Sequence, residues 1–161
     1  MNLLTRSFAL ILWLSLASIL VACNSTSSAE ADTADSCPLT EPVWLKPPED
    51  SAVLTPPEFG YYFVNEDSSI WAGAWGAPAD GYHLLAGDEG NKMGWFRPAG
   101  ETLTITGQRL DAEAPPLEAE IPCCYPTQFQ ATGLYFPTEG CWEVTAAAAE
   151  SELSFVVLVE P

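Results

Sequence analysis

The stretch Gly133–Pro161, GLYFPTEGCWEVTAAAAESELSFVVLVEP, decides the fold. Trp142 and Val144 alternate with more polar neighbours, and every second residue from 153 to 159 is aliphatic or aromatic. A period of two is typical of a half-buried strand. The segment between, 145–154, has a high helix propensity because of its alanines, but strand patterns on both sides favour a hairpin. The chain is therefore predicted to end in two long strands joined by a tight turn.

Shorter segments of the same kind occur upstream and are separated by turn residues. The strands expected there cover residues 61–65, 70–75, 83–86, 93–97, 103–105, 117–121 and 129–132. Fourteen prolines and eleven glycines disfavour a helical bundle, because both residues interrupt helix interiors. About eight to ten short strands in one chain predict an all-β sandwich or barrel.

The C-terminal stretch resembles the last two strands of an immunoglobulin-like sandwich found in bacterial exported proteins. The aromatic-Pro-x-x-Gly corner, residues 136–140, leads into an aromatic-containing strand as it does there. The segments GWFRPAG, LTITGQRLD and APPLEAEIP extend the resemblance to uncharacterised bacterial lipoproteins over residues 92–161. It implies an immunoglobulin-like antiparallel β-sandwich for residues 37–161. It implies no activity, since sandwiches carry unrelated functions.

The N-terminus has the features of a signal peptide. Residues 1–22 hold one cation, Arg6, and then an apolar run that is short for a membrane-spanning helix. Leu20-Val21-Ala22-Cys23 resembles the lipobox of bacterial lipoproteins. By that resemblance Cys23 becomes the first mature residue and carries acyl chains, two or more of which anchor a protein stably. The alternative is an ordinary secretory signal that a cysteine happens to follow.

Residues 23–36 are expected to form a lipidated flexible linker. They contain no large apolar side chain, so they cannot bury enough surface to offset the entropy of ordering. The sequence thus predicts a domain held by lipid on the exported face of the cell membrane or the outer membrane.

Charge and composition narrow the function. The chain has 22 acidic residues against 5 Lys and Arg, a formal net charge of −17. No basic patch for nucleic acid can be assembled from so few cations. His83 is the only histidine, which disfavours a catalytic triad or a His-based metal site. We expect no catalytic residue, no resident metal and no cofactor, and we expect His83 at or near the surface.

Four cysteines remain after Cys23, and an even number in an exported chain suggests two disulfides with three connectivities. A bond between the adjacent Cys123 and Cys124 is the least favoured, since neighbouring Cα atoms lie about 3.8 Å apart. Strand alternation points Cys124 and Cys141 to the same side. The pairs Cys124–Cys141 and Cys37–Cys123 are therefore predicted. A redox role for the adjacent pair is the alternative, although the usual two-residue spacer and a neighbouring cation are lacking.

Aromatic and basic residues supply the remaining candidates. Trp71 and Trp75 fall on one face of an expected strand and Tyr82 follows, so the three form a candidate binding surface for a sugar or a peptide. Their alternative role is to fill the core. Trp142 and either Trp95 or Phe96 are predicted core residues. The scarce cations Arg97 and Arg109 are expected to pair with surrounding carboxylates.

These observations predict a membrane-anchored, non-catalytic cell-envelope module for binding or interaction. Its expected partners are membrane lipid, through acylated Cys23, and a protein or glycan, with no nucleic acid. The alternative is a periplasmic or surface carrier of a small molecule or metal ion.

Overall fold

The computed structural model describes residues 37–49, 59–74, 82–123 and 125–161, which form ten strands and no helix. The strands are β1 (Val43–Leu45), β2 (Gly60–Val64), β3 (Trp71–Ala74), β4 (Leu84–Leu85), β5 (Asn91–Phe96), β6 (Leu103–Arg109), β7 (Glu118–Glu120), β8 (Phe129–Tyr135), β9 (Gly140–Ala148) and β10 (Ser151–Glu160). The all-β class predicted from the sequence is confirmed. Among these residues no helix is long and apolar enough to cross a membrane.

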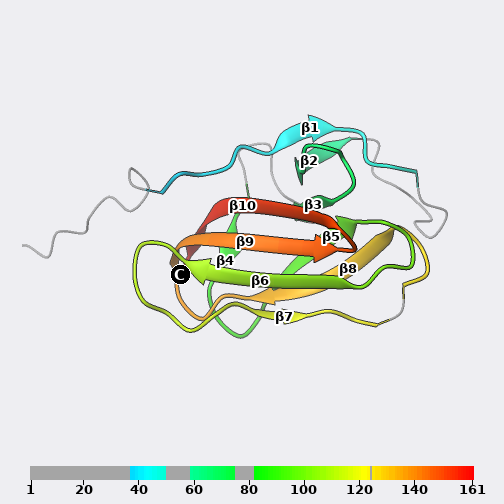
Figure 1. Cartoon of the computed structure of the whole chain (residues 1–161). Coiled ribbons are helices and arrows are strands. Elements are labelled where there is room, and N and C mark those ends of the chain that lie inside the picture. The colour runs from blue at the N-terminus through cyan, green and yellow to red at the C-terminus, as the bar shows by residue number, and fades with distance from the viewer. Residues whose placement is uncertain (1–36, 50–58, 75–81, 124) are drawn as a thin grey trace, which may run out of the picture.

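The strands form two sheets, consistent with a β-sandwich. One has six strands in the order β1-β2-β3-β5-β8-β7, and the other has four in the order β4-β10-β9-β6. All pairs are antiparallel except β4 with β10 and an isolated bridge between Ala86 and Phe136. Figure 1 shows β10, β9 and β6 side by side, with β1 and β2 beyond β10, β7 beyond β6, and β8 crossing behind β6.

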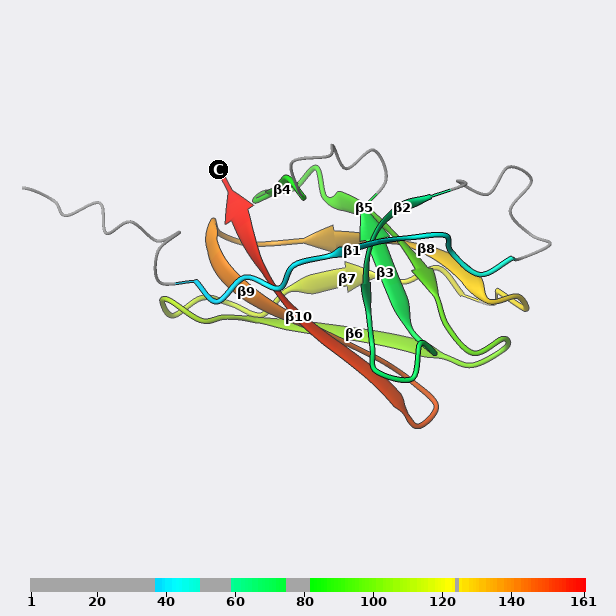
Figure 2. The same cartoon turned by 90° about the horizontal axis from the view of Figure 1, so that it is seen from above.

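The β9–β10 hairpin is the longest pairing, and it confirms the predicted C-terminal hairpin. Its register runs from Ser151 opposite Ala148 to Val159 opposite Gly140. Ala149 in the turn has φ 52°, a positive φ of the kind that tight hairpin turns require. The tip of this hairpin projects beyond the other strands (Figure 2). Helix propensity in the alanine run is overridden here by two amphipathic strands that bury their inner faces.

The core lies between the inner faces of the two sheets. Trp95 from β5 and Trp142 from β9 are both fully buried, and Phe96 is 4% exposed, so the predicted core aromatics are confirmed. Phe155 of β10 stacks on Phe63 of β2 with ring centroids 4.1 Å apart, which joins the two sheets. Each such side chain contributes about 1.5–3 kcal/mol when fully buried.

The two sheets are also joined at their margins. Residues 37–41 run beside β10, where the N–H of Thr40 donates to the carbonyl of Val156 (2.9 Å), and the chain then crosses to pair with β2 as β1. On the opposite margin the N–H of Leu117 donates to the carbonyl of Gly107 in β6 (3.1 Å). Sequence patterns missed β1, because Val43-Trp44-Leu45 is too short and too uniformly apolar to show alternation.

Candidate functional site

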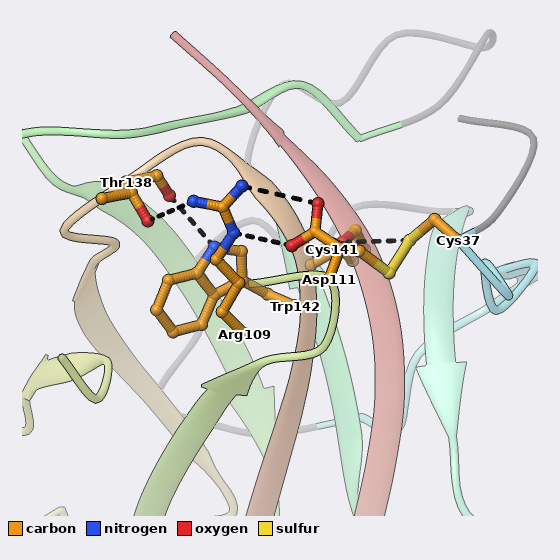
Figure 3. Close-up of polar contacts among 7 residues, drawn as sticks. Cys37, Arg109, Asp111, Thr138, Cys141 and Trp142 are labelled. Carbon is orange, nitrogen blue, oxygen red and sulfur yellow. Dashed lines mark hydrogen bonds and ion pairs between the residues drawn. A yellow bond between two sulfur atoms is a disulfide. The ribbon is translucent and has the colours of Figure 1, made fainter. Parts of the chain in front are cut away.

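A disulfide fixes the start of the described chain to the four-stranded sheet. Cys37 bonds Cys141 of β9, with Cα atoms 5.5 Å apart and a sequence separation of 104. Both cysteines are buried, at 8% and 1% exposure. Cys37 lies beside β10, its Sγ 4.0 Å from the carbonyl of Val157 (Figure 3).

This bond corrects the predicted pairs Cys124–Cys141 and Cys37–Cys123, which are wrong. Alternation did place the side chain of Cys141 opposite the core-facing Trp142, but residues 37–41 run beside β10, and this brings Cys37 against Cys141 of the neighbouring β9. Cys123 is also disulfide-bonded, and its partner lies outside the described residues, as Cys124 does.

An ion pair lies close to the disulfide at the same end of β9. Arg109 donates from Nε to Oδ1 of Asp111 (2.6 Å) and from Nη1 to Oγ1 of Thr138 (3.1 Å). The Trp142 indole N–H donates to the carbonyl of Thr138 (3.0 Å), so the corner before β9 is held from both sides (Figure 3). The predicted pairing of Arg109 with a carboxylate is confirmed.

The ion pair shifts the pKa values of both partners. The hydrogen bond from Arg109 lowers the pKa of Asp111, and the backbone of Cys141 adds to this effect. The hydrogen bond to Asp111 in turn raises the pKa of Arg109. Both side chains are mostly covered, at 17% and 14% exposure. The cluster is thus a charged clasp on the corner, in which each charged group already has a partner.

The candidate binding surface of Trp71, Trp75 and Tyr82 is not assembled as predicted. Trp71 lies on the outer face of the six-stranded sheet, edge-on to Tyr62 (5.6 Å between centroids). Tyr82 stacks on Phe63 (4.8 Å), which faces the core. Trp75 lies outside the described residues.

Tyr62 occupies the space over Gly73, where the candidate binding surface was expected to take a ligand. A Cβ on Gly73 would lie only 2.7 Å from the Tyr62 ring, so the glycine between the two tryptophans accommodates this ring. Tyr62 is 7% exposed, and burial raises the pKa of its phenol. The flat aromatic surface expected from the sequence is therefore already occupied, at least at Gly73, by the protein's own tyrosine.

A different aromatic group is exposed, which we call the aromatic edge: Trp44, Phe59 and Tyr61. Trp44 of β1 is 56% exposed and Phe59 is 53% exposed. Their rings stack at 10° with centroids 6.2 Å apart, and Tyr61 meets Trp44 edge-on at 4.8 Å. Sequence reasoning missed this group, although three consecutive apolar residues ahead of Lys46-Pro47-Pro48 were a readable signal.

The predicted ion pair between Arg97 and a carboxylate is not formed in the described part of the chain. Arg97 is 3% exposed and has no carboxylate partner, whereas the ion pairs among the described residues are Lys46–Glu49, His83–Glu160 and Arg109–Asp111. The guanidinium donates instead to Oε1 of Gln130 (2.8 Å) and to the carbonyls of Pro98 (2.8 Å) and Tyr125 (2.9 Å). Burial lowers its pKa, and the charge of Glu101 opposes that effect.

The remaining candidates from the sequence are His83, a metal site and the acylated Cys23. His83 is half exposed and lies 3.3 Å from Glu160, in keeping with the predicted surface position. Within the described ranges no group of three or more His, Cys, Asp or Glu side chains is arranged to hold a metal ion. Cys23 lies outside them, so its modification stays a prediction.

No family model, curated protein or solved structure matches the chain. The structure itself therefore gives its class, an all-β protein of two sheets in which a disulfide links the first described residue, Cys37, to β9. Its distinctive features are an exposed aromatic edge and a buried arginine that forms no ion pair with any described carboxylate.

Proposed function

We propose that the protein is a membrane-anchored, non-catalytic cell-envelope lipoprotein that binds another protein through the aromatic edge. The lipobox-like segment ending at Cys23 supports the anchor, and the polar residues 24–36 support a tether that keeps the domain clear of the membrane. Within this proposal the domain is an immunoglobulin-like sandwich, supported by the two packed sheets and the buried Trp142.

The observation that carries the binding proposal is the exposure of Trp44 and Phe59 side by side. A stacked Trp–Phe pair that is more than half exposed leaves a costly apolar surface in water. Tryptophan and tyrosine are also the residues that most often dominate the energy of protein interfaces. Val43 and Leu45 of β1 are also 48% and 37% exposed, but they alternate with Trp44 and so lie on the opposite face of the strand.

Sheet order and charge define the partner's chemistry. β1 is the last strand of its sheet in the described part of the chain, so a partner strand can add to it through main-chain hydrogen bonds. The net charge of −17 disfavours an acidic partner and a second copy of the same chain. The expected partner is a protein with an apolar patch rimmed by Lys or Arg.

The test is site-specific photo-crosslinking in intact cells. A benzophenone side chain replaces Trp44 or Phe59, and a matched control replaces Leu110, which is 43% exposed but follows β6 in the other sheet. We expect the same basic protein to be trapped from positions 44 and 59 but not from 110, and Trp44→Ala to weaken its binding tenfold or more. Adducts only with glycan or lipid, or equal trapping from 110, would overturn the proposal.

The anchor is tested separately. Cys23→Ala is expected to yield a precursor that is neither acylated nor cleaved before residue 23, and that no longer partitions into the detergent phase. Cys37→Ala is the matched control, because it removes another cysteine and should leave partitioning unchanged. Normal acylation of the Cys23→Ala protein would contradict a lipid anchor at this residue.

The second candidate function is a carrier of a small molecule. It is favoured by one observation that does not involve the aromatic edge: the buried Arg97 lines a hollow.

A further inference from the structure

A hollow of about 500 Å³ opens at one end of the space between the two sheets. Its wall combines the ends of β5 and β8 with the segment before β6 and the segment after β7. The lining includes Arg97, Glu101, Leu103, Ile121, Tyr125 and Gln130. This volume lies in the range of small-molecule sites, roughly 300–1,000 Å³.

Arg97 is the charged group of this hollow. Arg97 directly follows β5, two residues after the core-facing Trp95, and it is 3% exposed and lines the hollow. A guanidinium has five N–H donors, and three of them are used by Gln130, Pro98 and Tyr125. Within the described residues the other two donors have no acceptor and are available to a ligand, although Arg97 is only 3% exposed.

Gln130 holds the guanidinium in place. It is also 3% exposed, accepts from Arg97 Nε, and donates from Nε2 to the carbonyl of Pro122 (2.8 Å). Every oxygen that Arg97 contacts is thus a neutral amide or carbonyl oxygen. Such oxygens satisfy donors but supply no negative charge. The charge of Glu101 acts on Arg97, but the two form no ion pair in the described part of the chain, and a buried charge without a paired counter-charge is costly.

We propose that this hollow binds a small organic monocarboxylate, with Arg97 as its charged contact. A carboxylate matches two guanidinium N–H groups geometrically and supplies a directly hydrogen-bonded counter-charge, which Glu101 does not. The aliphatic side chains of Leu103 and Ile121 line the space for an apolar body. Glu101 in the lining and the acidic chain as a whole disfavour a dianion such as a phosphate monoester.

The probes are benzoate and N-acetylphenylalanine, each compared with its neutral amide. The first represents a free carboxylate, and the second represents the C-terminus of a peptide. Binding is measured by calorimetry on the full chain in detergent. We expect at least one carboxylate to bind and its amide to bind about tenfold to a hundredfold more weakly, as the loss of a charge-assisted contact predicts. The arm that binds identifies the source of the carboxylate.

Gln130→Glu is the decisive variant, because it places a carboxylate on Arg97 at nearly unchanged shape. It should reduce probe affinity at least tenfold while the protein stays folded. Glu101→Gln should raise the affinity, since it removes a negative charge from the lining. Glu152→Gln, an exposed carboxylate on β10, is the control and should change nothing.

Arg97→Gln should also abolish binding, but this buried residue could be needed for folding, so the result from Gln130→Glu takes precedence. Equal binding of acids and amides, no binding of either acid to the wild type, or full affinity in the Gln130→Glu protein would each overturn the proposal.

Discussion

Cys37 and Cys141 join the first described residue of the chain to a central strand of the four-stranded sheet. Residues 37–41 lie along β10, so the disulfide crosses to β9 where Leu158 pairs with Cys141. If Cys23 carries the lipid anchor, the linker ends at Cys37. A force applied through that linker would be transmitted to the β9–β10 hairpin by the disulfide before it could separate β1 from β2.

The first prediction follows from this bond. Replacing both residues, Cys37→Ala with Cys141→Ala, should destabilise the protein by on the order of 4 kcal/mol, because the closed loop spans 104 residues. Residues 37–45 should exchange their amide hydrogens first, while β9 and β10 stay protected. Denaturant unfolding and hydrogen-exchange mass spectrometry measure the two effects. A non-reducing peptide map that links Cys37 to Cys123 instead would refute the pairing.

The second prediction concerns pH and the Arg109–Asp111 clasp. The pKa of Asp111 is lowered in the folded protein, so the pair contributes its full stability above the ordinary aspartate pKa of about 3.9. That contribution is lost as pH falls through the lower, folded-state pKa. Asp111→Asn should therefore cost about 1–2 kcal/mol at pH 7, and the difference from wild type should disappear at acid pH.

Unfolding free energies at a series of pH values between 2 and 7 check this. Glu152→Gln serves as the matched control, because Glu152 is exposed and has no ion pair in the described part of the chain. A loss for Asp111→Asn that is constant across the series would contradict an ionic contribution.

The third prediction concerns Gly140, which has φ 132° and faces the same arginine. A Cβ there would lie 2.5 Å from Arg109 Nε and 2.7 Å from Cζ. Gly140→Ala should thus combine backbone strain of about 1–3 kcal/mol with displacement of the guanidinium from Asp111. Gly87→Ala isolates the strain, since Gly87 has φ 107° with open space around it.

Thermal unfolding of both variants should show a larger loss at Gly140. The excess should vanish when Asp111→Asn is already present, because the clasp is then without its charge. Equal losses at Gly87 and Gly140 would mean that Arg109 moves aside at no cost.

The sequence predicted the parts of this fold that depend on local pattern. The alternation around Trp142 and across residues 153–159 was enough to predict the β9–β10 hairpin, because each strand buries one face. The same alternation placed Trp142 in the core and Cys141 opposite it.

Contacts between distant segments could not be predicted in this way. The partner of Cys37 depends on residues 37–41 lying beside β10, and no periodicity reports that position. For Arg97, alternation with Trp95 could have indicated an inner-face position. The neutral oxygens around it belong largely to backbone carbonyls, which carry no sequence signal.

The last prediction concerns Gly73 and Tyr62 on the outer face of the six-stranded sheet. A Cβ on Gly73 would lie 2.7 and 2.8 Å from two carbons of the Tyr62 ring, so Gly73→Ala forces this 7%-exposed ring to move. We expect a loss of about 1–3 kcal/mol, typical of overpacking. In a Tyr62→Ala background the ring is gone, and alanine at 73 should be neutral or slightly stabilising, since it strengthens the strand relative to glycine. A double-mutant cycle from urea unfolding measures this coupling. Additive losses would show that the Tyr62 ring is not the reason that position 73 requires a glycine.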